Sequence, residues 1–198
     1  VSGPASTSTK PTCAATTEDA NVSGDLDLTG AQPVTIHGNA ATIHQTCTGE
    51  RVLHTLAGSG GLTIQNTTIT GGRGPGGIAI WAGASLTLDQ VTVDGSQGPA
   101  DFGGSNDLTS QQAAVATIAG TSGALLIKGS TVQHTVDGAG ITDRQRSGGT
   151  FLVTGSAITA NGTAVDTDRL AAGGIVAGGR DLTITDSRVR LNDLSGLP

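Results

Sequence analysis

The sequence contains almost no aromatic residues: its 198 residues include no Tyr, two Phe and one Trp, and Met is absent as well. Ordinary globular cores take much of their volume from aromatic rings. Only 13% of the residues are charged. The chain is long enough for one domain or one continuous repeat array. We therefore expect a single narrow interior that is filled by Ile, Leu and Val side chains.

Basic residues are also scarce. The ten Lys and Arg residues are scattered along the chain, against sixteen acidic residues, and the formal net charge is -6. Nucleic-acid binding needs clustered positive charge, so we expect no nucleic-acid partner. No apolar run approaches the roughly 20 residues that a membrane span requires, and no secretory signal pattern opens the chain. We expect a soluble chain without membrane insertion, and its start at Val1 indicates a processed or trimmed product.

Cysteine is limited to Cys13 and Cys47, which lie 34 positions apart without a C-x-x-C pair. Two cysteines alone do not make a zinc site of the usual kind. Three histidines nevertheless lie close by in sequence: His37, His44 and His54. We expect a disulfide that ties the Ser/Thr/Pro-rich lead, residues 1–20, to the first repeat. Such a bridge contributes about 3 to 4 kcal/mol and indicates an oxidising, extracytoplasmic setting.

A nine-residue motif recurs along the rest of the chain, with the pattern apolar, x, apolar, x, x, small or Val, x, Ile or Val, x. Its copies are LTIQNTTIT from Leu62, LTLDQVTVD from Leu86, LLIKGSTVQ from Leu125, FLVTGSAIT from Phe151 and LTITDSRVR from Leu182. Residues 34–43 (VTIHGNAATI) form a sixth copy that is two residues longer. The spacing between copies varies, so the motif is constant and the inserts differ in length.

A shorter apolar motif precedes each copy, as in VLHTLAGSGG, IAIWAGAS, VATIAGTSG, ITDRQRSGG and IVAGGRD. Alternation with period 2 in short β-branched runs indicates strands, and no sustained period of 3.6 indicates helix. One such unit cannot bury its apolar side alone, whereas stacked units share an interior at a spacing of about 4.8 Å. The sequence therefore predicts an all-β, right-handed parallel β-helix of about six coils over residues 21–198. We expect it to be truncated at its C-terminal end.

Stacking predicts files of equivalent side chains. Three apolar files should lie inside: Leu62, Leu86, Leu125, Phe151 and Leu182; Ile64, Leu88, Ile127, Val153 and Ile184; Ile69, Val93, Val132, Ile158 and Val189. A file of mostly small residues should follow the bend: Thr67, Val91, Ser130, Ser156 and Ser187. In the shorter motif we expect Trp81 to lie in one column with Ile118 and Arg144.

The phrases GGLTIQNTTITGG, GGIAIWAGASLTLDQVTVDGS and GGIVAGGRDLTITDSRVRLN resemble the single-stranded right-handed β-helix proteins, which share the pectate-lyase-like fold. In particular, they are similar to a bacterial surface family related to polymorphic outer-membrane passenger domains. The resemblance covers residues 21–195 and implies an adhesin-like protein at the bacterial surface. The Asn that usually ends the family motif is present here only as Asn161 and Asn192.

Enzymes of this fold need carboxylates around calcium and a base, or a pair of carboxyl groups across a groove. The segments that mark the hydrolases of this fold are absent from the sequence. If the chain is an enzyme, a polysaccharide lyase or glycoside hydrolase, the candidate catalytic residues are Asp143, Arg144 and Arg146 in ITDRQRSGG. The simpler interpretation is an outward turn in which Asp143 pairs with an arginine in solvent. We expect no cofactor, and the one candidate against this is calcium at Asp166 and Asp168, where a complete oxygen shell is not visible in the sequence.

The single tryptophan, Trp81, could stack on a sugar ring, with Phe102 and Arg144 as further binding residues. Alternatively, Trp81 covers a cleft beneath the insert 94–113 and packs there against Phe102. We favour packing for Trp81.

These observations favour a non-enzymatic β-helix that is secreted or displayed on the cell surface as an adhesin-like or stalk-like module. The variable inserts 94–113 and 160–174 would form its recognition surface for a glycan or protein ligand. Two alternatives remain open. One is a polysaccharide-active enzyme or glycan-binding module. The other is a self-assembling fibre subunit, because no capping helix follows the last motif and its strand edge is left open to edge-to-edge association.

Overall fold

The computed structural model describes residues 13, 24–74, 77–98, 112–119, 121–145, 148–162 and 173–192. In this part of the chain it contains strands and no helix, and therefore no helix that could cross a membrane. The strands are β1 (Leu26–Leu28), β2 (Val34–His44), β3 (Leu53–Thr55), β4 (Leu62–Thr70), β5 (Gly77–Ala82), β6 (Leu86–Asp94), β7 (Ala113–Thr117), β8 (Leu125–Lys128), β9 (Thr131–Gln133), β10 (Ala139–Asp143), β11 (Phe151–Thr154), β12 (Ala157–Thr159), β13 (Ile175–Ala177), β14 (Leu182–Thr185) and β15 (Arg188–Arg190).

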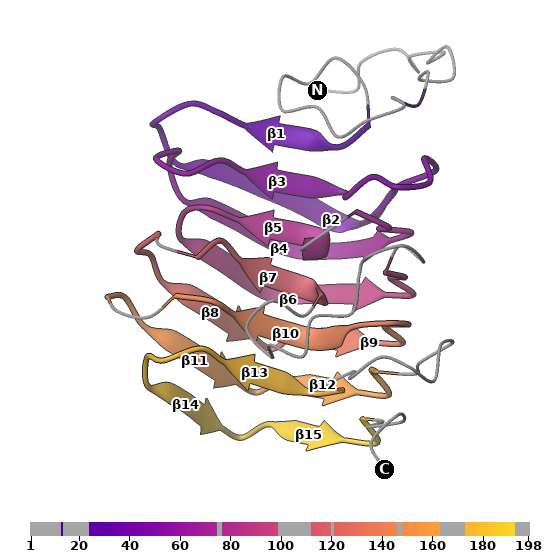
Figure 1. Cartoon of the computed structure of the whole chain (residues 1–198), viewed down its shortest axis with the longest axis vertical. Helices are drawn as coiled ribbons and strands as arrows, with labels where there is room; N and C mark the ends of the chain where they lie inside the picture. Colours follow the sequence, from indigo (N-terminus) through magenta and orange to yellow (C-terminus); the bar gives the residue numbers. More distant parts are fainter. Residues whose placement is uncertain are drawn as a thin grey trace.

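The chain alternates between two parallel sheets and winds as a right-handed parallel β-helix of about five turns (Figure 1). The short-strand sheet has the order β1-β3-β5-β7-β10-β13. The long-strand sheet begins with β2, β4 and β6, and each later coil contributes two shorter strands, β8 and β9, β11 and β12, or β14 and β15. The predicted fold class is confirmed, and the turn number is close to the expected six coils.

All three predicted apolar files of the nine-residue motif are confirmed by the strand register. Leu62, Leu86, Leu125, Phe151 and Leu182 are successive partners, and the other two files follow the same pairing. Their members on β4 to β12 are buried in one continuous core. Aliphatic side chains from the short-strand sheet complete this core from the opposite side: Leu53, Ile80, Val115 and Ile141.

The bend inside each nine-residue motif uses left-handed backbone, which Asn, Asp and Gly tolerate best. The residues at this bend are Asn66, Gln90, Gly129, Gly155 and Asp186, all with φ between 47° and 57°. The first coil has two extra residues here, and the pairing of β2 with β4 shifts between His37 and Ala41. This shift accounts for the longer copy of the motif seen in the sequence.

Small residues follow the bend because their hydroxyl groups bind the backbone of the preceding coil. The amide of Val91 donates to Ser130 Oγ at 3.0 Å, the amide of Ser130 donates to Ser156 Oγ at 3.1 Å, and the amide of Ser156 donates to Ser187 Oγ at 3.0 Å. The predicted small-residue file is therefore a ladder of hydrogen bonds. Further along the coil, the amide N–H of Asn161 and its side-chain NH₂ both donate to Asn192 Oδ1 at 3.1 Å, which forms a two-coil asparagine ladder.

Trp81 does not lie in the predicted column with Ile118 and Arg144. Trp81 pairs with Ala116, and Ala116 pairs with Thr142. When the short motifs IAIWAGAS and VATIAGTSG are compared, Ile78 is opposite Val115, but in the structure Ile80 pairs with Val115. A slip of two residues keeps the same faces inside and outside, which is why alternation alone could not detect it.

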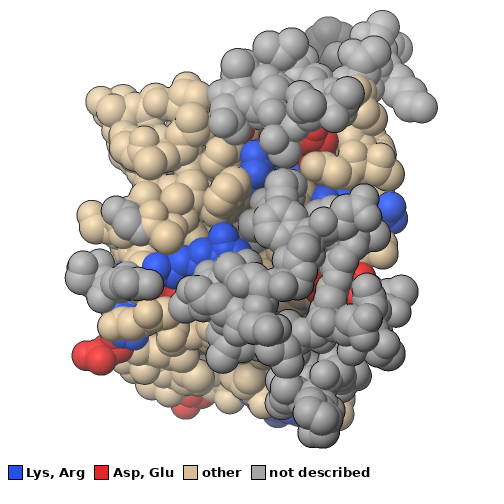
Figure 2. All heavy atoms as spheres, in the orientation of Figure 1, with Lys and Arg blue, Asp and Glu red and all other residues tan. Residues whose placement is uncertain are grey.

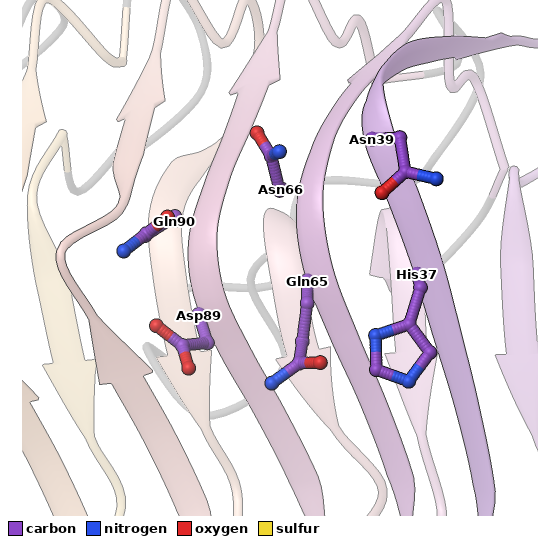
Figure 3. A pocket seen from close by; sticks show the side chains of 6 residues that line it. All are labelled: His37, Asn39, Gln65, Asn66, Asp89 and Gln90. Carbon is purple, nitrogen blue, oxygen red and sulfur yellow. The ribbon is translucent and has the colours of Figure 1, made fainter.

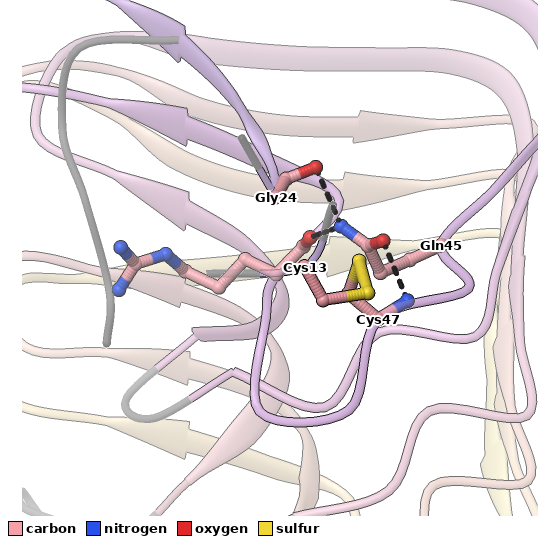
Figure 4. The surroundings of a disulfide bond; sticks show 5 residues. Cys13, Gly24, Gln45 and Cys47 are labelled. Atoms are coloured by element: carbon pink, nitrogen blue, oxygen red, sulfur yellow. Dashed lines mark hydrogen bonds between the residues drawn. A yellow bond between two sulfur atoms is a disulfide. The ribbon is translucent and has the colours of Figure 1, made fainter. Parts of the chain in front are cut away.

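The disulfide between Cys13 and Cys47 is present, with the two Cα atoms 5.4 Å apart. The adjoining turn is held by Gln45, whose side-chain NH₂ donates to the carbonyl oxygens of Gly24 and Arg51. Gln45 Oε1 in turn accepts from the amide of Cys47 at 3.0 Å (Figure 4). The first coil is therefore fastened both covalently and by hydrogen bonds.

Replacing one member of an inner file should be costly. Leu88→Ala removes a fully buried side chain that has neighbours in the coils on both sides. We expect a loss of about 2 to 5 kcal/mol in the free energy of unfolding, measured by urea denaturation. Thr87→Ala, on the outward side of the same strand, should cost about 1 kcal/mol or less. Equal losses in the two variants would contradict the inner position of Leu88.

Candidate functional site

A column of side chains projects from the outer face of the short-strand sheet. Asp27, His54, Trp81, Ala116 and Thr142 are partners in successive strands of this sheet. Although they point away from the core, all except Trp81 are buried, and Trp81 is partly buried. This outer face therefore holds polar and aromatic groups away from water.

At the N-terminal end of this column lies a polar cluster, which we define as Asp25, Asp27, Arg51, His54 and Trp81. Arg51 Nε donates to Asp25 Oδ2 at 2.9 Å. His54 Nδ1 lies 3.1 Å from Asp27 Oδ1 and 3.4 Å from Arg51 Nη2. Since buried charges are stable only when paired, these contacts explain how the side chains tolerate their burial.

The ring of Trp81 forms one wall of the polar cluster. His54 stacks on it with ring centroids 5.2 Å apart and planes inclined by 16°, and the guanidinium carbon of Arg51 lies 4.8 Å from the ring centroid. Trp81 also packs against small residues of the same outer face, Ala113, Ala116 and Ala139. Its ring contacts are thus largely taken by the protein, which agrees with packing. Phe102, its expected neighbour, lies outside the described residues.

Asp143 lies in an internal file with Thr117 and Ala82, and its carboxylate is buried. Arg180, from the next coil, donates from Nε to Asp143 Oδ2 at 2.6 Å and from Nη2 to Oδ1 at 3.0 Å. The hydroxyl of Thr117 donates to Oδ1 at 2.7 Å. Arg180 Nη1 donates to the carbonyls of Gly123 and Gly148. Asp143 is therefore paired with an arginine as the simpler interpretation proposed, but inside the protein and not in solvent.

Arg144 is half-buried, and its backbone amide donates to Thr117 Oγ1 at 2.8 Å. Burial lowers the pKa of the Arg144 guanidinium from its ordinary value. The hydroxyl of Thr117 thus contacts the backbone of Arg144 and the buried carboxylate of Asp143. The other candidates, Arg146, Asp166 and Asp168, lie outside the described residues, so their roles stay predictions.

Charged side chains are sparse on the face that carries the short-strand sheet. In Figure 2 most of the described surface on this face is uncharged, with only separate blue and red areas.

A polar trough of about 280 Å³ lies on the outer face of the long-strand sheet, at the bends of the first three coils (Figure 3). Its lining residues are His37, Asn39, Gln65, Asn66, Asp89 and Gln90. His37, Gln65 and Asp89 are partners in β2, β4 and β6 and form one row. The other three residues have positive φ values of 48°, 47° and 57° and form a second row at the bends. The trough is therefore a direct product of the repeat.

The sequence interpretation missed the polar cluster, Arg180 and the trough. A weak signal existed for the cluster, because LDL from Leu26 and LHT from Leu53 occupy equivalent places in the short motif. The signal for the trough was the polar residues at the bend of each motif: QN from Gln65, DQ from Asp89 and HGN from His37. Arg180 lies in a turn between two strands, and the alternation of apolar residues within strands does not predict where the side chains of a turn point.

The buried pair of Asp143 and Arg180 should be necessary for stability. Asp143→Ala leaves the guanidinium of Arg180 buried without its carboxylate, and we expect a loss of about 3 to 5 kcal/mol in the free energy of unfolding. The double variant Asp143→Leu with Arg180→Met should lose much less than the sum of the single variants. Urea denaturation measures both, with Arg190→Met on exposed β15 as the control. Additive losses would show that the two side chains do not interact.

In comparisons with known proteins, no family model, no curated protein and no solved structure matches this chain.

Proposed function

We propose that this chain is a non-enzymatic β-helix module, secreted or displayed at a cell surface, that binds a hydroxyl-rich glycan along its polar trough. The observation that carries the proposal is the trough itself: two rows of hydrogen-bonding side chains repeat over three coils on a rigid scaffold. The enzymatic alternative has less support, because both carboxylate oxygens of the candidate Asp143 already accept hydrogen bonds from Arg180 or Thr117.

The chemistry of the trough suits a neutral, polar ligand. The side-chain amides of Asn39, Gln65, Asn66 and Gln90 can each donate and accept hydrogen bonds, and the carboxylate of Asp89 accepts them. Adjacent sugar hydroxyls present the same mixture of donors and acceptors. The single acidic side chain and the absence of Lys and Arg from the lining disfavour a strongly acidic polymer.

The extracellular location of the protein and its relation to a bacterial surface family are also part of the proposal. The disulfide between Cys13 and Cys47 supports an oxidising, extracellular setting. The resemblance to bacterial polymorphic outer-membrane passenger domains supports surface display and an adhesin-like role. The inserts 94–113 and 160–174 lie mostly outside the described residues, and we propose that they add specificity to the trough.

The trough can be tested with an array of neutral and uronic-acid oligosaccharides. We expect the full chain to bind a neutral oligosaccharide and to leave it uncleaved. Gln65→Ala combined with Asp89→Ala should weaken binding by roughly tenfold, because two hydrogen bonds of about 0.5 to 1.5 kcal/mol each are lost. Thr63→Ala, an outward position that does not line the trough, is the matched control. Unchanged binding in the double variant would place the ligand elsewhere, and cleaved sugar would favour the enzymatic alternative.

Self-association is a second candidate function, favoured by the apolar residues of the last coil. Ile184 and Val189 belong to inner files, yet they are 44% and 42% exposed, and Leu191 is 76% exposed. Within the described part of the chain, β13, β14 and β15 each pair on one side only. A strand edge next to exposed apolar residues is a site where a second chain can add.

Sedimentation velocity at several protein concentrations tests this candidate. We expect the sedimentation coefficient of the full chain to rise with concentration, and Ile184→Lys combined with Val189→Lys to remove that rise, since charges at a strand edge oppose pairing. The control is Thr87→Lys combined with Thr92→Lys, which places the same two charges on the outer side of β6. A monomer at every concentration would eliminate this candidate.

A further inference from the structure

We propose that Asp25, Asp27 and His54 bind one divalent metal ion of the zinc class on the outer face of the first two coils. This site goes beyond the proposed function and does not depend on it. Among the described residues, these three form a group of metal-ligating side chains whose ligand atoms all lie within 4.8 Å of one another. All three side chains are buried.

The strand register creates this group. Asp27 lies in β1 and points to the outer face of the short-strand sheet, and Asp25 lies at the bend directly before this strand, where it accepts a hydrogen bond from Arg51. His54 pairs directly with Asp27 in the next coil. Zn–N and Zn–O bonds are about 2.0 to 2.2 Å long, so two ligand atoms on one ion are at most about 4.4 Å apart. The ligand atoms therefore need only a small contraction to hold an ion.

The carboxylate of Asp25 gives an independent reason to expect a bound cation. Its Oδ2 accepts from Arg51 Nε, but its Oδ1 is buried and has no hydrogen-bond partner among the described residues. The side chain of Asp25 is fully buried. A buried carboxylate oxygen without a partner is costly, and coordination of a cation would remove that cost.

Arg51 and Trp81 can support the site without being ligands. Arg51 holds one oxygen of Asp25 and thereby directs the other, in the way that hydrogen-bonded neighbours orient metal ligands. Trp81 stacks on His54 and fixes the plane of its ring.

Two carboxylates with one imidazole suit zinc better than calcium or magnesium, which prefer oxygen ligands alone. Such an ion would join β1 to β3 near the disulfide and stabilise the first coil.

The experiment uses the full chain with its disulfide intact, after removal of bound metal with a chelator. Zn²⁺ and Co²⁺ are then added while metal content, melting temperature and the fluorescence of Trp81 are measured. Trp81 is the only tryptophan, so its emission reports directly on His54. We expect one equivalent of metal per chain, a higher melting temperature with Zn²⁺, and quenching of the emission by Co²⁺.

The variants Asp27→Asn and His54→Gln should weaken Zn²⁺ binding by at least about 100-fold. Loss of a hydrogen-bonded neighbour of a ligand costs up to about 100-fold in metal affinity, and loss of a ligand itself should cost no less. A control variant that replaces the exposed His37, His44 and His134 with Ala should keep full binding and quenching. If the unaltered chain takes up no metal and its emission stays constant, the proposal fails. Binding that disappears only in the control variant would also overturn it, because the metal would then lie on surface histidines.

Discussion

The structure depends on the hydrogen-bonded stacking of one coil directly on the next. Each strand pairs in parallel with its equivalent one coil away, so equivalent side chains lie over one another. This constraint converts the repeated motif into apolar files inside and polar rows outside. It explains why a chain with so few aromatic residues has a continuous core: the interior is narrow, and aliphatic side chains fill it.

The same stacking gives polar residues different roles according to where they lie. Inside, Asp143 requires Arg180 from the neighbouring coil, because a buried carboxylate needs a partner. On the outer face of the short-strand sheet, Asp27 and His54 are brought together by register alone. On the outer face of the long-strand sheet, the bend residues form a trough. A single winding rule thus produces a structural ion pair, a candidate metal site and a candidate ligand surface.

The sequence was sufficient to predict the fold class, the files of the nine-residue motif and the disulfide. The fold class and the files follow from the alternation and repetition of the motif, and the disulfide follows from the presence of only two cysteines. The position of Trp81 relative to Ala116 could not be predicted, because a slip of two residues in the pairing of β5 with β7 leaves the alternation unchanged. The pairing of Asp143 with Arg180 joins residues 37 positions apart across a turn, and the short motif carries no trace of it. Contacts that depend on how such a turn folds can be identified only from the three-dimensional structure.

The separation between constant motifs and variable inserts has an evolutionary consequence. One added residue within a strand such as β6 would reverse every side chain beyond it, so that Leu and Val would face water and Thr the core. Residues added between β6 and β7 change no pairing, and the entropy cost of a longer loop grows only slowly with its length. The scaffold can therefore acquire new surface segments between its strands while its winding stays the same.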